Sequence, residues 1–237
     1  MKKKNEIKEV CLEEAFPFLK EKKRKILCVV GAGGKTTLIF TLAEECAKAG
    51  KRTLVTTTTH MYEPTDGSFV SDVEERFLKN QYAVVGEKTS YGKIKGVKRE
   101  TLLIYEEQAD MIFIEADGAK RKPCKVPKET EPVIVPECQI VVGVVGLDAI
   151  GKPLSEACFR TKEAKRLLKC SDFHVITKED IAMILSSYHG TRKETDGKEY
   201  YIVLNKCDDE MRKKDAIWIL EALSQYGCQK VIISRLL

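Results

Sequence analysis

Three familiar signals are missing from this chain of 237 residues. No apolar run approaches the roughly 18 residues that a membrane-spanning helix requires. The basic first residues are followed by Glu13 and Glu14 instead of the apolar stretch of a signal peptide. The nine cysteines contain no Cys-x-x-Cys pair, and their number is odd. We therefore expect a cytoplasmic protein with reduced thiols and without a membrane partner.

A strong charge of one sign is also missing, because 41 basic and 36 acidic residues leave a formal net charge of +5. Basic residues gather at 20–25 and 120–128, but no aromatic side chains alternate with them to stack on bases. A solvated basic surface explains the first cluster, so we expect no nucleic-acid partner. Cys124 and Cys138 lie in or beside the second cluster without the histidines or paired cysteines of a zinc site, which favours isolated buried thiols.

Apolar segments of strand length alternate with helical patterns along the chain, which is typical of a parallel sheet covered by helices. The segments with the composition of buried strands are 26–30, 53–57, 82–85, 111–114, 140–145, 200–204 and 231–234. Helical patterns are found at 35–49, 71–80, 98–109, 162–170, 178–187 and 215–226. The sequence therefore predicts an α/β, three-layer, P-loop NTPase-like fold with a mostly parallel sheet. We expect residues 26–237 to form one such domain, after an N-terminal helical extension at 1–25.

The turn between the first strand and its helix is rich in glycine and ends in a lysine and two threonines. Its residues are Gly31, Ala32, Gly33, Gly34, Lys35, Thr36 and Thr37. Backbone N–H groups at a helix N-terminus bind phosphate, and only glycine lets the main chain approach that closely. We expect Lys35 to reach the β- and γ-phosphates of a nucleoside triphosphate and the Thr36 hydroxyl to bind Mg²⁺. The loop is shorter than the standard G-x-x-x-x-G-K-[ST], because Val29 takes the place of the first glycine, and it is similar to that of the Mur ligases.

The strand predicted at 111–114 ends in acidic residues, as a Walker B element does. Glu115 and Asp117 follow it directly, and Glu115-x-x-Gly118 occupies the place of the GTPase switch D-x-x-G. A carboxylate at a strand tip can hold Mg²⁺ or position the attacking water. We predict that Lys35, Glu115 and Asp117 are the catalytic residues, and either acid could hold the metal.

The sequence Asn205-Lys206-Cys207-Asp208 follows the strand predicted at 200–204 and matches the guanine-binding N-K-x-D of GTPases. The Asp208 carboxylate can accept hydrogen bonds from N1–H and N2–H₂ of guanine, a pair that adenine does not present. A second match at 177–180 is better explained as a helix start capped by Thr177. We predict that Asn205, Lys206 and Asp208 bind the nucleotide, with GTP preferred and ATP as the alternative.

Two further segments supply candidate contacts. Four threonines and a histidine occupy residues 56–60, at the end of the second predicted strand, where ligands bind in open α/β sheets. The β-propensity of threonine explains residues 56–57, whereas Thr59 and His60 are candidates for contacts with phosphate, metal or substrate. In the second basic cluster, Lys120 and Arg121 could stabilise transition-state charge, hold an anionic substrate or be solvated.

With these residues assembled, the chain resembles the YqeC family, whose members are associated with selenium-dependent molybdenum hydroxylases. The matching stretches are VVGAGGKTTL (29–38), TTTTHM (56–61), FIEADGAKRKPCK (113–125), EPVIVP (131–136), VVGVVGLDAIGKPL (141–154) and LNKCD (204–208). The resemblance implies a part in maturing such an enzyme. It also implies a molybdenum hydroxylase or its cofactor-assembly proteins as the partner.

Three functions remain open on the sequence. The first is a Mg²⁺-dependent nucleoside triphosphatase that drives the assembly or insertion of a cofactor. The second is a kinase- or nucleotidyltransferase-like enzyme that acts on an anionic small molecule. The third is a non-catalytic, nucleotide-gated scaffold, or a selenium carrier that uses a cysteine as nucleophile.

Overall fold

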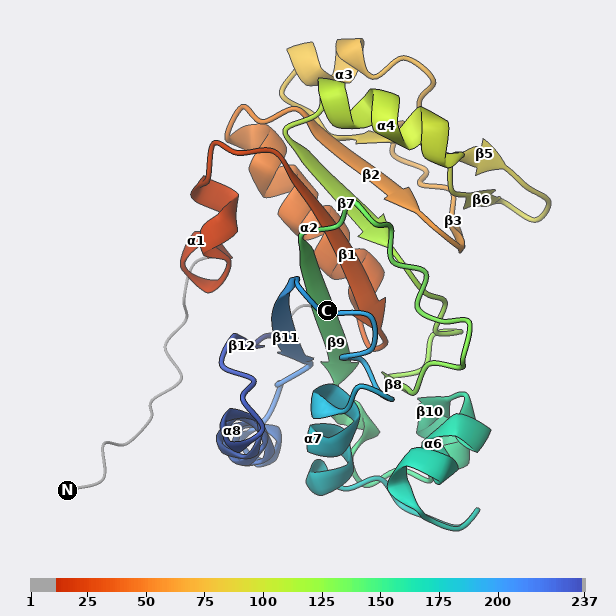
Figure 1. Cartoon of the computed structure of the whole chain (residues 1–237), viewed down its shortest axis with the longest axis vertical. Coiled ribbons are helices and arrows are strands. Elements are labelled where there is room, and N and C mark those ends of the chain that lie inside the picture. Colours follow the sequence, from red (N-terminus) through yellow and green to blue (C-terminus); the bar gives the residue numbers. More distant parts are fainter. Residues whose placement is uncertain (1–11, 236–237) are drawn as a thin grey trace.

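The computed structural model describes residues 12–235. Its centre is a seven-stranded sheet in the order β12-β11-β9-β1-β7-β2-β4, in which every neighbouring pair is parallel (Figure 1). The strands of this sheet are β1 (Lys25–Gly31), β2 (Thr53–Thr57), β4 (Ala83–Val84), β7 (Met111–Glu115), β9 (Ile140–Gly146), β11 (Glu199–Asn205) and β12 (Val231–Ile233). The predicted α/β fold with a mostly parallel sheet is confirmed.

Helices lie on both faces of this sheet. They are α1 (Leu12–Ala15), the 3₁₀ helix η1 (Pro17–Lys20), α2 (Lys35–Lys48), α3 (Glu74–Leu78), α4 (Arg99–Gln108), the 3₁₀ helix η2 (Leu147–Ala149), α5 (Leu154–Ala157), α6 (Thr161–Leu168), α7 (Lys178–Ser186) and α8 (Glu210–Gln225). Alternate residues of β11 show the two faces: Tyr201 and Val203 pack in the cluster that contains α2, whereas Ile202 and Leu204 pack with α7 and α8. The fold therefore has three layers. Within residues 12–235, no helix has both the length and the apolar character that crossing a membrane requires.

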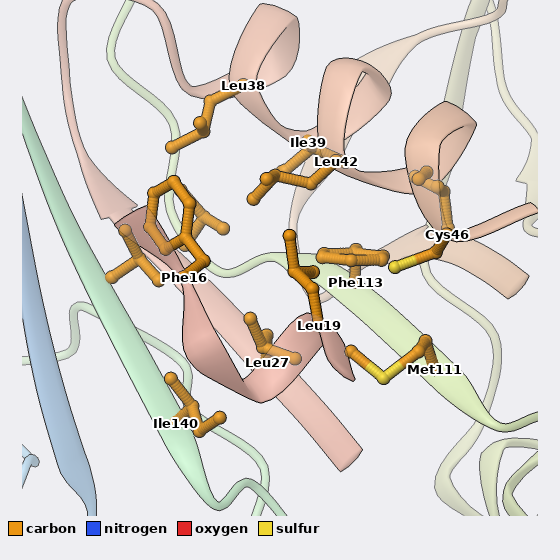
Figure 2. Close-up of a cluster of buried hydrophobic side chains, with 14 of the residues drawn as sticks. Phe16, Leu19, Leu27, Leu38, Ile39, Leu42, Cys46, Met111, Phe113 and Ile140 are labelled. Carbon is orange, nitrogen blue, oxygen red and sulfur yellow. The ribbon is translucent and has the colours of Figure 1, made fainter. Parts of the chain in front are cut away.

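The segment before β1 closes the core on the α2 face. Figure 2 shows Phe16 and Leu19 among side chains from α2 and from the strands of the sheet. Phe18 is 1% exposed, and its ring lies edge-on to Tyr201, with 5.2 Å between the ring centroids. The helical extension expected at 1–25 is divided, since Pro17 begins a 3₁₀ turn, and residues 1–11 lie outside the described residues. Burial of large aromatic side chains fixes this segment onto the sheet.

Two small sheets flank the main one. Residues 86–97, whose glycine and lysine content is typical of a hairpin or an exposed loop, form the hairpin of β5 (Glu87–Lys88) and β6 (Lys93–Lys95), and β6 pairs as well with β3 (His60–Tyr62). Residues 116–137, whose four prolines and lack of a regular period are typical of a loop, contain β8 (Cys124–Lys125), which pairs with β10 (Cys158–Phe159). The sequence analysis missed β3, β8 and β10 because strands of two or three residues carry too little apolar pattern.

Two predicted helix starts are wrong. The helix predicted from residue 71 begins at Glu74, whose N–H donates to Asp72 Oδ1 at 3.0 Å instead of to a serine cap. The helix predicted from residue 215 begins at Glu210, because the Asp209 side chain accepts a hydrogen bond from Arg212 N at 2.8 Å and caps it there. The polar first turn of this helix hides its periodicity.

Candidate functional site

The glycine-rich turn joins β1 to α2 along a path that other residues cannot follow. Gly31, Gly33 and Gly34 have φ angles of +90°, +80° and +127°. A Cβ on Gly31 would lie 2.3 Å from the carbonyl oxygen of Val144, and a Cβ on Gly33 would lie 2.1 Å from the nitrogen of Gly146. Both distances are shorter than any real contact, so glycine is required by conformation and by the close approach of β9.

The N–H groups of this turn fall into two sets. Those of residues 31–33 are bonded inside the protein, to Asp117 Oδ2, the Val144 carbonyl and the Lys122 carbonyl. The first turn of α2, at residues 35–37, has no intrahelical acceptor for its N–H groups, and no side chain caps it. The helix macrodipole adds a partial positive charge at the same place. Anion binding is therefore available at the first turn of α2 and not along the earlier part of the loop.

Lys35, the first residue of α2, is folded back over the glycine turn. Its side chain is only 4% exposed, and Nζ donates to the Gly31 carbonyl at 2.8 Å. The same nitrogen lies 3.1 Å from Asp117 Oδ1 and 3.8 Å from Glu115 Oε1. Because the two carboxylates are themselves buried, they hold the ammonium strongly. An incoming anion has to compete with Asp117 for this lysine.

Glu115, the last residue of β7, faces Thr36 across the carboxyl edge of the sheet. The Thr36 hydroxyl donates to Glu115 Oε2 at 2.7 Å. Burial raises the pKa of Glu115, while Lys35 and the Thr36 hydroxyl oppose the rise. Adjacent hydroxyl and carboxylate oxygens are ligands that Mg²⁺ accepts. No group of three or more His, Cys, Asp or Glu side chains suited to a metal occurs in residues 12–235, so Mg²⁺ here would take its other ligands from phosphate and water.

A chain of alternating charges leads from Lys35 into the protein. Asp117, which contacts Lys35, also lies 3.1 Å from Nζ of Lys125, whose side chain is 0% exposed. Lys125 Nζ lies 3.1 Å from Glu131 Oε2, and the Arg160 guanidinium binds both oxygens of Glu131. Although burial opposes it, hydrogen bonding to Arg160 and the charge of Lys125 lower the pKa of Glu131 to about 2. The sequence analysis missed Lys125, Glu131 and Arg160, because their local patterns do not distinguish them from solvated charges.

Asn205, at the end of β11, touches the glycine turn. Its Nδ2 donates to the carbonyl of Gly33 at 2.8 Å, between residues 172 positions apart in the chain. Its Oδ1 is buried and accepts no hydrogen bond from residues 12–235. A Cβ on Gly34 would lie 2.2 Å from Nδ2, so the two segments are in close contact. The N-K-x-D segment is therefore brought beside the turn.

The two charged residues after Asn205 are each held by a partner. Lys206 Nζ donates to Asp148 Oδ2 at 3.0 Å, and Asp148 lies in η2, directly after β9. Asp208 Oδ2 accepts from Nη1 of Arg212 at 2.9 Å, and the Asp208 side chain is 42% exposed. The spacing of four residues between Asp208 and Arg212 on a helix start was the signal for this ion pair that the sequence analysis missed.

The residues of the segment 56–60 have different surroundings: Thr56 and Thr57 lie in β2, whereas Thr59 and His60 follow its end. The hydroxyl of Thr56 donates to the Val85 carbonyl, and that of Thr57 donates to the Glu115 carbonyl. Thr59 and the exposed His60 line a cavity of about 400 Å³. None of residues 31–37 lines it, so this cavity is separate from the glycine turn.

The two basic candidates after the acidic strand end lie against aromatic rings. Lys120 Nζ is 5.5 Å from the ring centroid of Phe159, and Arg121 Cζ is 5.1 Å from that of Tyr62. These are cation–π distances. The backbone of the same loop contacts the glycine turn, because the Lys122 carbonyl accepts the N–H of residue 33 at 3.2 Å. Lys120 and Arg121 are therefore close to the turn through their main chain, with their charged groups stacked on rings.

A comparison with known protein families matches the part of the chain that contains the glycine turn and Glu115. The family model described as "YqeC protein" matches residues 27–162. The uncharacterized protein YqeC of Escherichia coli (strain K12) is 35% identical over 145 residues, which are 57% of this chain and 57% of that protein. The match thus spans less than two thirds of that relative's length.

Two solved structures resemble the chain at a low level. HypB from Helicobacter pylori in complex with nickel has a TM-score of 0.38 and 10% identity, over 94% of this chain and 83% of HypB. FtsY from Mycoplasma mycoides has a TM-score of 0.34 and 11% identity, over 90% of this chain and 53% of FtsY. At these scores neither structure carries an argument about the site.

Proposed function

The chain belongs to the YqeC family, and from that premise and the site geometry we propose that it is a Mg²⁺-dependent nucleoside triphosphatase. GTP is the preferred nucleotide and ATP the alternative. One observation carries the proposal: at the carboxyl end of β7, Lys35 contacts Asp117 and Thr36 contacts Glu115, and these are the first two residues of α2. A lysine, a hydroxyl and two acids that meet at an uncapped helix N-terminus have the chemistry that phosphoryl transfer requires.

Binding of the triphosphate would use the first turn of α2. Its N–H groups point out of the helix end, and Lys35 supplies a full positive charge. On binding, the Lys35 ammonium exchanges Asp117 for the β- and γ-phosphate oxygens. Asp117 remains compensated during this exchange, because Lys125 stays 3.1 Å from its other oxygen.

Hydrolysis would depend on Thr36, Glu115 and Asp117. Thr36 and Glu115 would hold Mg²⁺, which neutralises charge on the phosphate oxygens when it is bound. The N–H of Gly31 holds Asp117 Oδ2 in place. Asp117 Oδ1 can then orient the attacking water once Lys35 has moved to the phosphates. Lys120 and Arg121 remain candidates for stabilising the transition state, and they would have to leave their aromatic rings to do so.

Base recognition would use the N-K-x-D segment. Its contact with the glycine turn, through Asn205 Nδ2, supports this role, because a base reader has to lie within one nucleotide of the phosphates. Asp208 would accept from N1–H and N2–H₂ of guanine and share one oxygen with Arg212. Family membership supports a cellular role in maturing a selenium-dependent molybdenum hydroxylase, with that enzyme or its cofactor-assembly proteins as the partner.

A cysteine-based carrier is less well supported than a triphosphatase. The free cysteines of residues 12–235 are buried, apart from the half-buried Cys170. Burial raises the pKa of Cys170 and of Cys46, the latter to about 12, which disfavours the thiolate that a nucleophile needs. Transfer of a group to an anionic small molecule keeps support from the cavity at Thr59 and His60.

Phosphate release tests the proposal. Purified protein should release phosphate from GTP in the presence of Mg²⁺ and should stop when the metal is chelated. Lys35→Ala should abolish both phosphate release and calorimetric binding of the triphosphate, because it removes the main positive charge that would face the phosphates. Lys79→Ala changes an exposed lysine at the end of α3, outside the site, and should retain both. A wild-type protein that neither binds nor hydrolyses GTP or ATP would refute the assignment.

A further inference from the structure

A cavity of about 400 Å³ lies beside the proposed triphosphate site, between the end of β2 and the segment that leads into α4. Its polar part comes from the threonines of residues 56–59, His60, Lys95 and Arg99. Its apolar part is Val97, Leu102, Ile114, Val133 and Val135. A site with an apolar wall and a few convergent polar groups has the make-up of a small-molecule site.

The polar part of this cavity is cationic. None of the lining residues is an acid, whereas Lys95 and Arg99 carry permanent positive charge. Lys95 pairs with Glu87 at 2.9 Å, and Arg99 binds a single oxygen of Glu137 through Nε and Nη2. Both carboxylates lie outside the lining, so the charged residues that line the cavity are basic, and each of them is ion-paired with an acid beside it.

The start of α4 reinforces this charge. The helix has ten residues and begins at Arg99, and the N-cap Lys98 makes no side-chain hydrogen bond to it. Its first N–H groups therefore lack intrahelical acceptors, and the positive end of the helix dipole lies at the cavity. Arg99 and the two residues 96–97 bring this helix start into the lining.

The walls of the cavity are fixed by the backbone. A Cβ on Gly96 would lie 1.7 Å from the carbonyl oxygen of Thr57, so the segment before α4 is packed directly on the end of β2. The Thr58 hydroxyl donates to the Val133 carbonyl at 2.8 Å, which ties the third wall to the same strand end. A preformed cavity loses little conformational entropy when it binds a ligand.

Two residues that line the cavity are bonded to the backbone of the proposed catalytic residue Glu115. The Glu115 carbonyl accepts hydrogen bonds from the Thr57 hydroxyl at 2.7 Å and from Thr58 N at 3.1 Å. The side chain of the same Glu115 accepts the Thr36 hydroxyl. One residue of β7 thus separates the cavity from the place expected for the γ-phosphate.

We propose that this cavity binds a small organic anion, with a carboxylate or phosphate group at Arg99, Lys95 and the start of α4 and an apolar body against Leu102 and Ile114. Binding goes beyond the proposed triphosphatase and does not require it, since none of residues 31–37 lines the cavity. The position beside Glu115 makes this anion a second ligand of the same edge of the sheet.

Calorimetry with 2-naphthoate and its neutral analogue 2-naphthamide tests the site. We expect naphthoate to bind at least about tenfold more tightly than naphthamide, because a charge-assisted hydrogen bond is worth a factor of ten or more. Arg99→Met should lower naphthoate affinity about tenfold. Val133→Asp, at a half-exposed position, adds an acid while it keeps the Arg99–Glu137 pair, and should do the same. Arg24→Met, an exposed arginine bonded to the far part of α4, is the matched control and should bind naphthoate as the wild type does.

The outcomes separate this site from the triphosphate site. Lys35→Ala should retain naphthoate binding, and Arg99→Met should retain GTP binding. Loss of naphthoate binding in Lys35→Ala would place the anion on the glycine turn and overturn the proposal. Absence of naphthoate binding, equal affinity for naphthamide, or unchanged affinity in both Arg99→Met and Val133→Asp would overturn it as well.

Discussion

Lys125 Nζ lies 3.1 Å from Asp117 Oδ2, in a place where neither side chain is more than 2% exposed. Its third contact is the Gly118 carbonyl, at 2.7 Å, so the ammonium is fully enclosed by acceptors. A buried cation of this kind is stable only when it is paired with carboxylates. Lys125 therefore compensates the negative charge of Asp117 at the end of β7. This compensation remains when Lys35 moves to a phosphate.

Removing this cation should change both stability and the pH profile. Lys125→Met leaves Asp117 and Glu131 without a shared partner, and breaking a buried ion pair costs about 3–5 kcal/mol in the free energy of unfolding. The charge of Lys125 also lowers the pKa of Glu115, so the variant should move the acidic limb of hydrolysis to higher pH. Urea titration and a pH–rate profile measure the two effects. Lys128→Met removes another lysine of the same loop and is the control, so its acidic limb should not shift. An unshifted acidic limb in Lys125→Met as well would show that Lys125 has a structural role only.

Substitutions of the two acids at the carboxyl end of β7, Glu115 and Asp117, should have different effects. Glu115→Gln removes the carboxylate that contacts Thr36, so Mg²⁺ dependence and turnover should both be lost, by about a hundredfold or more in rate. Asp117→Asn removes the competitor that holds Lys35 at 3.1 Å, so triphosphate affinity should be kept or raised while hydrolysis falls. Calorimetry and phosphate release separate the two. Wild-type hydrolysis in both variants would exclude this strand end from the active site.

The proximity of Lys35, Thr36 and Glu115 was predictable because of a general property of parallel sheets. Lys35 and Thr36 begin the helix after one strand and Glu115 ends its neighbour, so both must lie at the carboxyl edge. The helix cap at Thr177 was predictable for a similar reason, since a side chain bonds within its own turn, and the structure contains the full capping box with Asp180.

What the sequence could not provide is pairing between distant charges. Lys125 and Glu131 lie in the loop of residues 116–137, Arg160 lies directly before α6, and each has neighbours typical of a solvated loop. The burial of Lys125 and Glu131 follows from the way residues 116–137 fold back onto the glycine turn, which no local period encodes. The cavity near Arg99 has the same origin, because it depends on the pairing of β3 with β6.

Acid stability should depend on Glu131. Its pKa of about 2 in the folded protein is below the ordinary value of 4.5. A carboxyl with a lowered pKa stabilises the fold above its unfolded pKa, and this stabilisation is lost as the pH falls toward the folded value. The free energy of unfolding of Glu131→Gln should therefore be lower than that of the wild type by about 3 kcal/mol at pH 7. The difference should shrink between pH 4.5 and pH 2, and a difference independent of pH in urea titrations would contradict this account.

Guanine recognition is the sharpest test of the N-K-x-D segment. Asp208 has one oxygen on Arg212 at 2.9 Å, and guanine would use both oxygens, so the arginine has to share. Wild-type protein should bind GTP more tightly than ATP by a factor of about ten to a hundred, since an unpaired polar group costs about 1–3 kcal/mol. Asp208→Asn should weaken GTP and strengthen xanthosine triphosphate, because the amide donates to the xanthine oxygen that replaces the guanine amine. Arg212→Met removes a competitor and not the reader, so it should keep the preference for GTP. If calorimetry finds equal affinity for ATP and GTP in the wild type and in Asp208→Asn, residues 205–208 are a strand-end turn whose Asn205 merely supports the glycine loop.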